Sequence, residues 1–210
     1  MKIEKGRENM LPQEKILAAL RECPIIASLQ KPEMVTTTIN SNVRIVMISS
    51  GDIFNIGEIS QILRKNNKLV LVHVDMIGGM ARDKVAIRYL KEKLDIDGIV
   101  TPNGQLVASG HKEGLLTAQR IFAHDTPSVI SGINALRQSK PDFIEIMPGV
   151  AVLKVYEEIK KHFQQPIIAA GLIKSIQDVK QILKAGALGA DTSNPNLWNF
   201  SISNSTTERL

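Results

Sequence analysis

The chain has 210 residues, of which 43% are apolar and 22% charged, so it has the size and composition of one folded α/β domain and not of a disordered protein. Its single cysteine, Cys23, excludes an internal disulfide and a thiolate metal cluster, and no apolar run approaches the roughly 18 residues of a membrane span, so we expect a cytoplasmic protein without membrane contact. The net charge of +5 permits an anionic partner, either a phosphorylated small molecule or nucleic acid.

Short apolar runs recur along the chain and alternate with helical patterns. Residues 1–23 form an N-terminal extension, in which Leu11 to Glu22 is an amphipathic helix expected to cap the floor of the domain. Most of the later runs are continuous, as strands covered on both faces should be. We predict strands at residues 24–29, 44–49, 69–75, 98–101, 116–122, 143–147, 167–170 and 188–190.

The helical patterns between these runs complete a repeated strand–helix unit. One apolar stripe contains Val85, Tyr89, Leu90 and Leu94, and a later helix begins at a capping box of Ser175 and Asp178. Eight such units predict a single-domain (β/α)₈ TIM-type barrel over residues 24–200, with an open doubly wound sheet as the alternative. Residues 201–210 are polar and are expected to form a flexible tail.

Polar residues occur at the C-terminal ends of the predicted strands, where barrels of this type bind ligands. Strand alternation points His73 and Asp75 inward from the third strand. Glu145 points inward from the sixth, and Arg120 on the fifth is its expected partner because a buried carboxylate needs a cation. Structural His–Asp and Arg–Glu pairs explain the same residues, so both interpretations stay open.

The ends of the seventh and eighth strands predict a phosphate site. Gly171 precedes a capped helix, and Ser193 and Asn194 precede a proline that suits the first turn of another. Backbone N–H groups at two neighbouring strand ends bind phosphate in such barrels. Gly149, after the sixth strand, is a further candidate. Capping alone explains Ser193 and Asn194, so the prediction depends on their pairing with Gly171.

An enzyme acting on a small phosphorylated metabolite, such as an isomerase, aldolase or phosphodiesterase, is the alternative. His73, Asp75 and Glu145 would then serve as acid and base or as a carboxylate metal site. No lysine lies within a predicted strand, which argues against a Schiff-base aldolase.

Four segments together resemble one family: His73 to Gly79 (HVDMIGG), Gln119 to Phe122 (QRIF), Pro141 to Gly149 (PDFIEIMPG), and Thr192 to Asn194 followed by Leu197-Trp198. The family is that of the glycerol-3-phosphate-responsive antiterminators, and the resemblance extends over about residues 24–198. It implies a barrel, a non-catalytic regulator without cofactor or metal, glycerol 3-phosphate as effector, and leader mRNA of glycerol-utilisation genes as partner. The implied pose puts phosphate on Gly171, Ser193 and Asn194, with His73, Asp75 and Glu145 on the glycerol hydroxyls.

The chain departs from the family pattern at three places. Ala170 and Asp191 replace a common glycine and threonine, and residues 106–113 lack the usual lysines. A carboxylate at position 191 would repel phosphate unless it is turned away or paired. A phosphate-binding barrel that has lost its RNA role is therefore a further alternative.

A basic helix face is the candidate for RNA contact. Arg82, Lys84 and Arg88 lie on the polar side of the third predicted helix of the barrel, where salt-dependent phosphate contacts are expected. A solvated helix face is the alternative explanation of these residues. The sequence is also compatible with a homo-oligomer.

Overall fold

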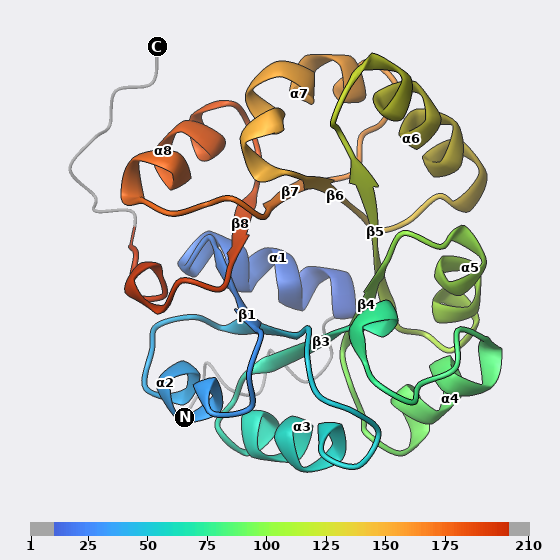
Figure 1. The fold of residues 1–210 in the computed structure, drawn as a ribbon, viewed down its shortest axis with the longest axis vertical. Coiled ribbons are helices and arrows are strands. Elements are labelled where there is room, and N and C mark those ends of the chain that lie inside the picture. The colour runs from blue at the N-terminus through green and yellow to red at the C-terminus, as the bar shows by residue number, and fades with distance from the viewer. Residues whose placement is uncertain (1–10, 202–210) are drawn as a thin grey trace.

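The protein is a closed barrel in a computed structural model that describes residues 11–201. Eight parallel strands pair in chain order, and the eighth closes on the first (Figure 1). The predicted (β/α)₈ barrel is confirmed, and the open-sheet alternative is wrong. The strands are β1 (Ile25–Leu29), β2 (Ile45–Ile48), β3 (Leu69–His73), β4 (Gly98–Thr101), β5 (Leu116–Phe122), β6 (Phe143–Met147), β7 (Ile167–Ala170) and β8 (Gly189–Thr192).

A ring of helices surrounds the strands, and one further helix closes an end of the barrel. The helices are α1 (Pro12–Glu22), α2 (Met34–Ile39), α3 (Ile56–Lys65), α4 (Lys84–Glu92), α5 (Gly104–Lys112), α6 (Thr126–Ser139), α7 (Val152–Lys160) and α8 (Ile176–Lys184). Short 3₁₀ turns follow three strands: η1 (Val74–Met76), η2 (Gly149–Ala151) and η3 (Pro195–Leu197). None of the helices described in residues 11–201 is long and apolar enough to cross a membrane.

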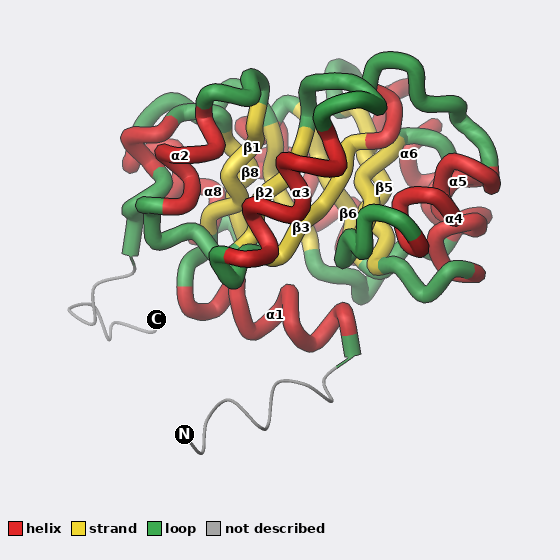
Figure 2. The backbone as a smooth tube through the Cα atoms, turned by 90° about the horizontal axis from the view of Figure 1, so that it is seen from below, coloured by secondary structure: helices red, strands yellow, loops and turns green. Residues whose placement is uncertain are grey.

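The apolar core has two parts that follow from strand alternation. Outward residues such as Val70 and Val72 pack under the helix ring, whereas inward residues such as Leu71 fill the barrel. Ile16 and Leu20 of α1 pack on this inner cluster, and Figure 2 shows α1 lying across one end of the strands. Because α1 covers the N-terminal strand ends, the opposite, C-terminal ends remain for a site.

The main differences from the expectation concern β3, β8 and α4. Strand β3 ends at His73, and Asp75 lies in the turn η1. Strand β8 extends to Thr192, because its last two residues, although polar, pair with β1 and β7. Helix α4 buries Ala86, Ile87 and Leu90, while Val85 and Tyr89 are exposed. Residues 1–10 of the expected extension and 202–210 of the expected tail lie outside the described residues.

Candidate functional site

An open cavity of about 880 Å³ lies at the C-terminal ends of β1, β2, β7 and β8. This is the end of the barrel at which the sequence places ligand groups. The loop after β7 and the end of β8 form one side, and polar residues after β1 and β2 form the other. Its polar lining consists of Ser28, Gln30, Ser49, Ser50, Arg120, Lys174, Asp191, Thr192, Ser193 and Asn194, together with the backbone from Ala170 to Ile173.

The loop after β7 has an uncommon backbone. Gly171 and Leu172 both have positive φ, 78° and 58°, and Leu172 is a bulky residue that rarely adopts this conformation. A Cβ at Gly171 would lie 2.8 Å from Cε of Met147, so glycine also suits the space. Strain of this kind is concentrated at ligand-binding turns, and it occurs here on the wall of the cavity.

Some amides just before α8 and η3 already have hydrogen-bond partners. The Asp178 carboxylate accepts from the amides of Lys174 and Ser175, and Asn194 N–H donates to Thr192 Oγ1. Within residues 11–201, the amides of Gly171, Leu172 and Ser193 form no hydrogen bond. These loop amides at the ends of β7 and β8 are therefore donors available to an anion, at the strand ends where the sequence predicts a phosphate site.

Hydrogen bonds connect the loops after β7 and β8. Thr192 Oγ1 donates to the Ile173 carbonyl at 3.0 Å, and the Asn194 side-chain amide donates to the Lys174 carbonyl at 3.0 Å. Because Asn194 also caps η3, both the nitrogen and the oxygen of its side chain have a partner. The Ser193 hydroxyl makes no hydrogen bond with any residue of the described range, so it remains available at the cavity wall.

Gly149 lies beneath the site rather than in it. Its N–H donates to the Gly171 carbonyl at 2.9 Å, and a Cβ here would lie 3.0 Å from Ile173. Gly149 thus lets the turn η2 approach the β7 loop closely, and it supports that loop without lining the cavity.

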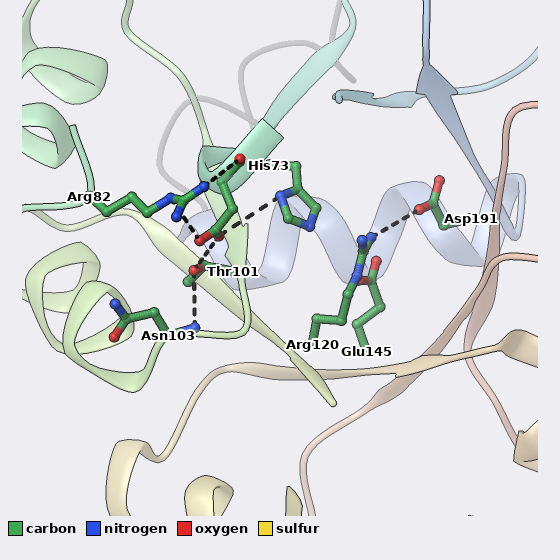
Figure 3. Close-up of polar contacts among 8 residues, drawn as sticks. His73, Arg82, Thr101, Asn103, Arg120, Glu145 and Asp191 are labelled. Atoms are coloured by element: carbon green, nitrogen blue, oxygen red, sulfur yellow. Dashed lines mark hydrogen bonds and ion pairs between the residues drawn. The ribbon is translucent and has the colours of Figure 1, made fainter. Parts of the chain in front are cut away.

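The expected ion pair between Arg120 and Glu145 forms inside the barrel. The two residues are register neighbours on β5 and β6, and Glu145 is only 2% exposed. A second carboxylate, Asp191, places Oδ2 4.0 Å from Arg120 Nη2 (Figure 3). One buried cation therefore lies between two carboxylates. Arg120 and Asp191 line the cavity, whereas Glu145 does not.

His73 and Asp75 lie near each other but outside the cavity lining. His73 Nδ1 is 3.9 Å from Asp75 Oδ2, and both His73 ring nitrogens are buried without a hydrogen-bond partner. Burial, assisted by the nearby Arg120 charge, lowers the pKa of His73 to about 4. Asp75 accepts from Thr101 Oγ1 at 2.7 Å and faces Arg82 Nε at 3.5 Å.

These contacts place Asp75 and Glu145 in separate clusters. Asp75 belongs with Thr101 and Arg82, and Glu145 belongs with Arg120 (Figure 3). Within residues 11–201, no three histidine, cysteine, aspartate or glutamate side chains are grouped so as to hold a metal ion.

The sequence did not indicate the residues on the β1 and β2 side of the cavity. Ser28 and Ser49 share a hydrogen bond of 2.9 Å between their hydroxyls, and Ser50 donates to the Leu29 carbonyl. The polar run that begins at Ser49, directly after an apolar strand, is the signal that could have identified this side.

The three basic residues proposed for RNA contact are exposed. Lys84 and Arg88 line a groove of about 220 Å³ between α4 and α5, which Lys112 of α5 also lines. Arg82 lies in the loop before α4, and its guanidinium donates to the Asp75 carbonyl at 3.3 Å. Their contact with RNA stays a prediction.

The sequence model of one family, described as glycerol-3-phosphate responsive antiterminator, matches residues 25–198. The chain belongs to this family. The resemblance inferred from the sequence is thereby confirmed, and the family is one of transcription regulators. Membership extends over the whole barrel, from the first residue of β1 to the end of the turn after β8.

Solved structures of similar proteins agree with the family. The glycerol uptake operon antiterminator regulatory protein of Listeria monocytogenes is 26% identical, with a TM-score of 0.80 over 84% of this chain and 95% of that one. An antiterminator-related protein of Thermotoga maritima is 28% identical, with a TM-score of 0.77 over 85% and 99%. The Escherichia coli protein YgcP, described as uncharacterized, is 29% identical over 87% of this chain and 95% of its own.

Some enzymes share only the fold. The N-acetylmannosamine-6-phosphate 2-epimerase of Clostridium perfringens is 16% identical with a TM-score of 0.62, covering 84% of this chain and 88% of its own. The deoxyribose phosphate aldolase of Aeropyrum pernix is 14% identical with a TM-score of 0.65, covering 93% and 94%. Structural similarity at such low sequence identity shows a shared fold and gives no information about activity.

Proposed function

We propose that the protein is a non-catalytic regulator that binds glycerol 3-phosphate in the barrel cavity and, in response, changes its affinity for the leader mRNA of glycerol-utilisation genes. Transcription then passes a terminator in that leader. Membership of the antiterminator family supports the regulatory role. The main support for this ligand is the group of unpaired loop amides at the ends of β7 and β8.

The phosphate would lie against the amides of Gly171, Leu172 and Ser193. Hydrogen bonds to a charged group contribute about 1.5–3 kcal/mol each, more than those between neutral groups. The Ser193 hydroxyl adds a fourth donor, and Lys174, which makes no ion pair with any described residue, adds charge at the rim. This combination favours a phosphate monoester over a neutral polyol.

A groove between α4 and α5 is the proposed RNA contact. Lys84 and Arg88 from α4 and Lys112 from α5 bring three cations to its walls, and Glu113 is the one acidic residue on them. Such a surface attracts the phosphodiester backbone through counterion release. Lys112 is the one lysine of the segment 106–113, which has fewer lysines than the family pattern.

A path of contacts connects the cavity with this surface. Arg120 lines the cavity and acts electrostatically on His73, which lies next to Asp75. Asp75 in turn holds Arg82 at the start of the basic region. We expect effector binding beside Arg120 to alter the position of Arg82 through this path.

The residues that line the cavity give less support to a catalytic role. No lysine occurs in any of the eight strands, and neither His73 nor Glu145 lines the cavity wall. The cavity thus offers donors for an anion but no histidine as a general base.

Calorimetric titration with glycerol 3-phosphate and with free glycerol tests the ligand. We expect glycerol to bind at least about 100-fold more weakly, since it lacks the group that uses the loop amides. Gly171→Ala should abolish the preference, because it forces a Cβ into a backbone with φ 78° against Met147.

Gly114→Ala is the matched control. Gly114 also has a positive φ, 67°, but a Cβ there meets no atom within 4 Å, and it lies in the loop between α5 and β5 away from the cavity. This variant should bind as the wild type does. Equal affinity of the wild type for glycerol 3-phosphate and glycerol would exclude the phosphate site.

A further inference from the structure

Asp191 is the acidic residue of the cavity wall that lacks a full set of partners. Its side chain is 4% exposed, and its Oδ1 has no hydrogen-bond partner in the described structure. Its other oxygen, Oδ2, lies 4.0 Å from Arg120, whose guanidinium is already bound to Glu145. A buried oxygen without a partner costs about 1–3 kcal/mol, which a ligand donor would recover.

We propose that Asp191 sets the specificity of the effector cavity by binding a hydroxyl group on the carbon chain of the ligand. The Arg120 guanidinium beside it holds the carboxyl in place. This inference rests on the proposed function, because it concerns the part of the phosphorylated effector that the loop amides do not contact.

The spacing along β8 fits a short phosphorylated chain. Asp191 precedes Ser193 by two residues, which corresponds to a rise of about 7 Å along a strand. Ala170 is the register partner of Asp191 on β7, so the β7 loop that begins at Gly171 lies above it as well. A phosphate at the level of the loop amides leaves a three-carbon chain pointing toward Asp191.

The surroundings of Asp191 favour a neutral hydroxyl over other end groups. Burial and the nearby Glu145 charge raise the pKa of Asp191, while Arg120 opposes this shift. In either protonation state the carboxyl can accept a hydrogen bond from a hydroxyl. The charge of Glu145, behind Arg120, disfavours a second anion, and the Arg120 charge disfavours an ammonium group. An alkyl end would leave Oδ1 unpaired.

This assignment replaces part of the pose that the sequence implies. Glu145 is closed off by Arg120, and Asp75 is engaged by Thr101 and Arg82. Neither lines the cavity, whereas Asp191 does. The residue that the family pattern marks as a departure therefore takes the role of hydroxyl acceptor.

Calorimetry with three phosphate monoesters tests the inference: glycerol 3-phosphate, propyl phosphate and O-phosphoethanolamine. The wild type should bind glycerol 3-phosphate at least about tenfold more tightly than propyl phosphate, because a site built to bind a hydroxyl rejects the analogue that lacks it. In Asp191→Leu, which keeps the branched shape but removes the acceptor, the two should bind equally. Asp191→Asn, which keeps an acceptor and a donor, should retain the preference.

Asp95→Asn is the control, since Asp95 is exposed and asparagine tolerates its positive φ of 48°. If Asp191→Leu does not fold, Asp191→Ala takes its place and should likewise bind glycerol 3-phosphate and propyl phosphate equally. An unchanged preference in these variants, or tighter binding of O-phosphoethanolamine by the wild type, overturns the inference while leaving the phosphate site intact. If the wild type binds none of the three, the proposed function fails and this inference fails with it.

Discussion

The burial of His73 lowers the free energy of unfolding by an amount that depends on pH. Its ring is 3% exposed and makes no hydrogen bond, and burial lowers its pKa from 6.5 to about 4. The unfolded chain therefore binds a proton between pH 6.5 and 4 that the folded chain does not. Stability is unaffected by this group above pH 6.5 and falls as the pH drops toward 4.

Urea denaturation at pH 7 and pH 5 measures this effect. The wild type should lose about 2 kcal/mol over this range through His73, and His73→Gln should lose less by that amount, because glutamine does not titrate. The other histidines are present in both proteins and cancel in the comparison. An equal loss in both proteins would show that His73 is protonated in the folded state.

At the scale of elements, the loops after β7 and β8 act as one unit. Thr192 connects them through its hydroxyl, which donates to Ile173 and accepts from Asn194. Thr192→Val keeps the shape but removes both bonds, so we expect a loss of about 1–2 kcal/mol in the free energy of unfolding and a weakening of glycerol 3-phosphate binding by about tenfold. Urea denaturation and calorimetry measure the two effects.

Thr38→Val is the control that separates the loss of stability from the loss of ligand affinity. Thr38 is equally buried, and its hydroxyl donates to Met34 within α2, away from the two loops. We expect this variant to lose stability without losing affinity for glycerol 3-phosphate. If Thr192→Val binds the ligand as tightly as Thr38→Val does, the connected loops do not hold the phosphate.

Most elements follow directly from local sequence, and the exceptions have physical reasons. The run 143–147 is predicted with the bounds of β6, because all of its residues except Glu145 are apolar, as is typical of a strand buried on both faces. The end of β8 is missed because Asp191 and Thr192 are polar, a composition typical of a loop. Their strand pairing depends on β1 and β7, which are distant in the sequence.

The candidate site is likewise predictable only in part, because some of its residues are brought together by strands that are distant in the sequence. The pairing of Arg120 with Glu145 follows from adjacent strands and the need of a buried carboxylate for a cation. The third member, Asp191, and the serines at the C-terminal ends of β1 and β2 reach the site only when the barrel closes. Which amides remain unpaired depends on side chains such as Asp178, whose contacts periodicity does not report.

At the scale of the whole molecule, the cavity and the basic groove are separate surfaces of one barrel. The cavity opens at the C-terminal strand ends, and the groove lies between the outer helices α4 and α5. A protein with two separate sites responds to an effector only if ligand binding at one changes affinity at the other. The path through His73, Asp75 and Arg82 is the connection that we propose for this coupling.

Charge reversal in the groove separates RNA binding from effector binding. Lys84→Glu/Arg88→Glu should weaken RNA binding and reduce its salt dependence by about 0.7–0.9 log units per log of salt for each RNA phosphate that is no longer neutralised, while glycerol 3-phosphate binding stays unchanged. Lys65→Glu/Lys184→Glu makes the same change in net charge on exposed lysines of α3 and α8 and is the control.

The most direct test of the central claim is the affinity of the protein for the leader RNA of glycerol-utilisation genes from its own organism, measured by gel shift with and without glycerol 3-phosphate. We expect saturating effector to change this affinity by at least about fivefold, a coupling of about 1 kcal/mol, and free glycerol to leave it unchanged. RNA affinity that is the same with and without glycerol 3-phosphate, or no specific binding in either condition, would contradict the account.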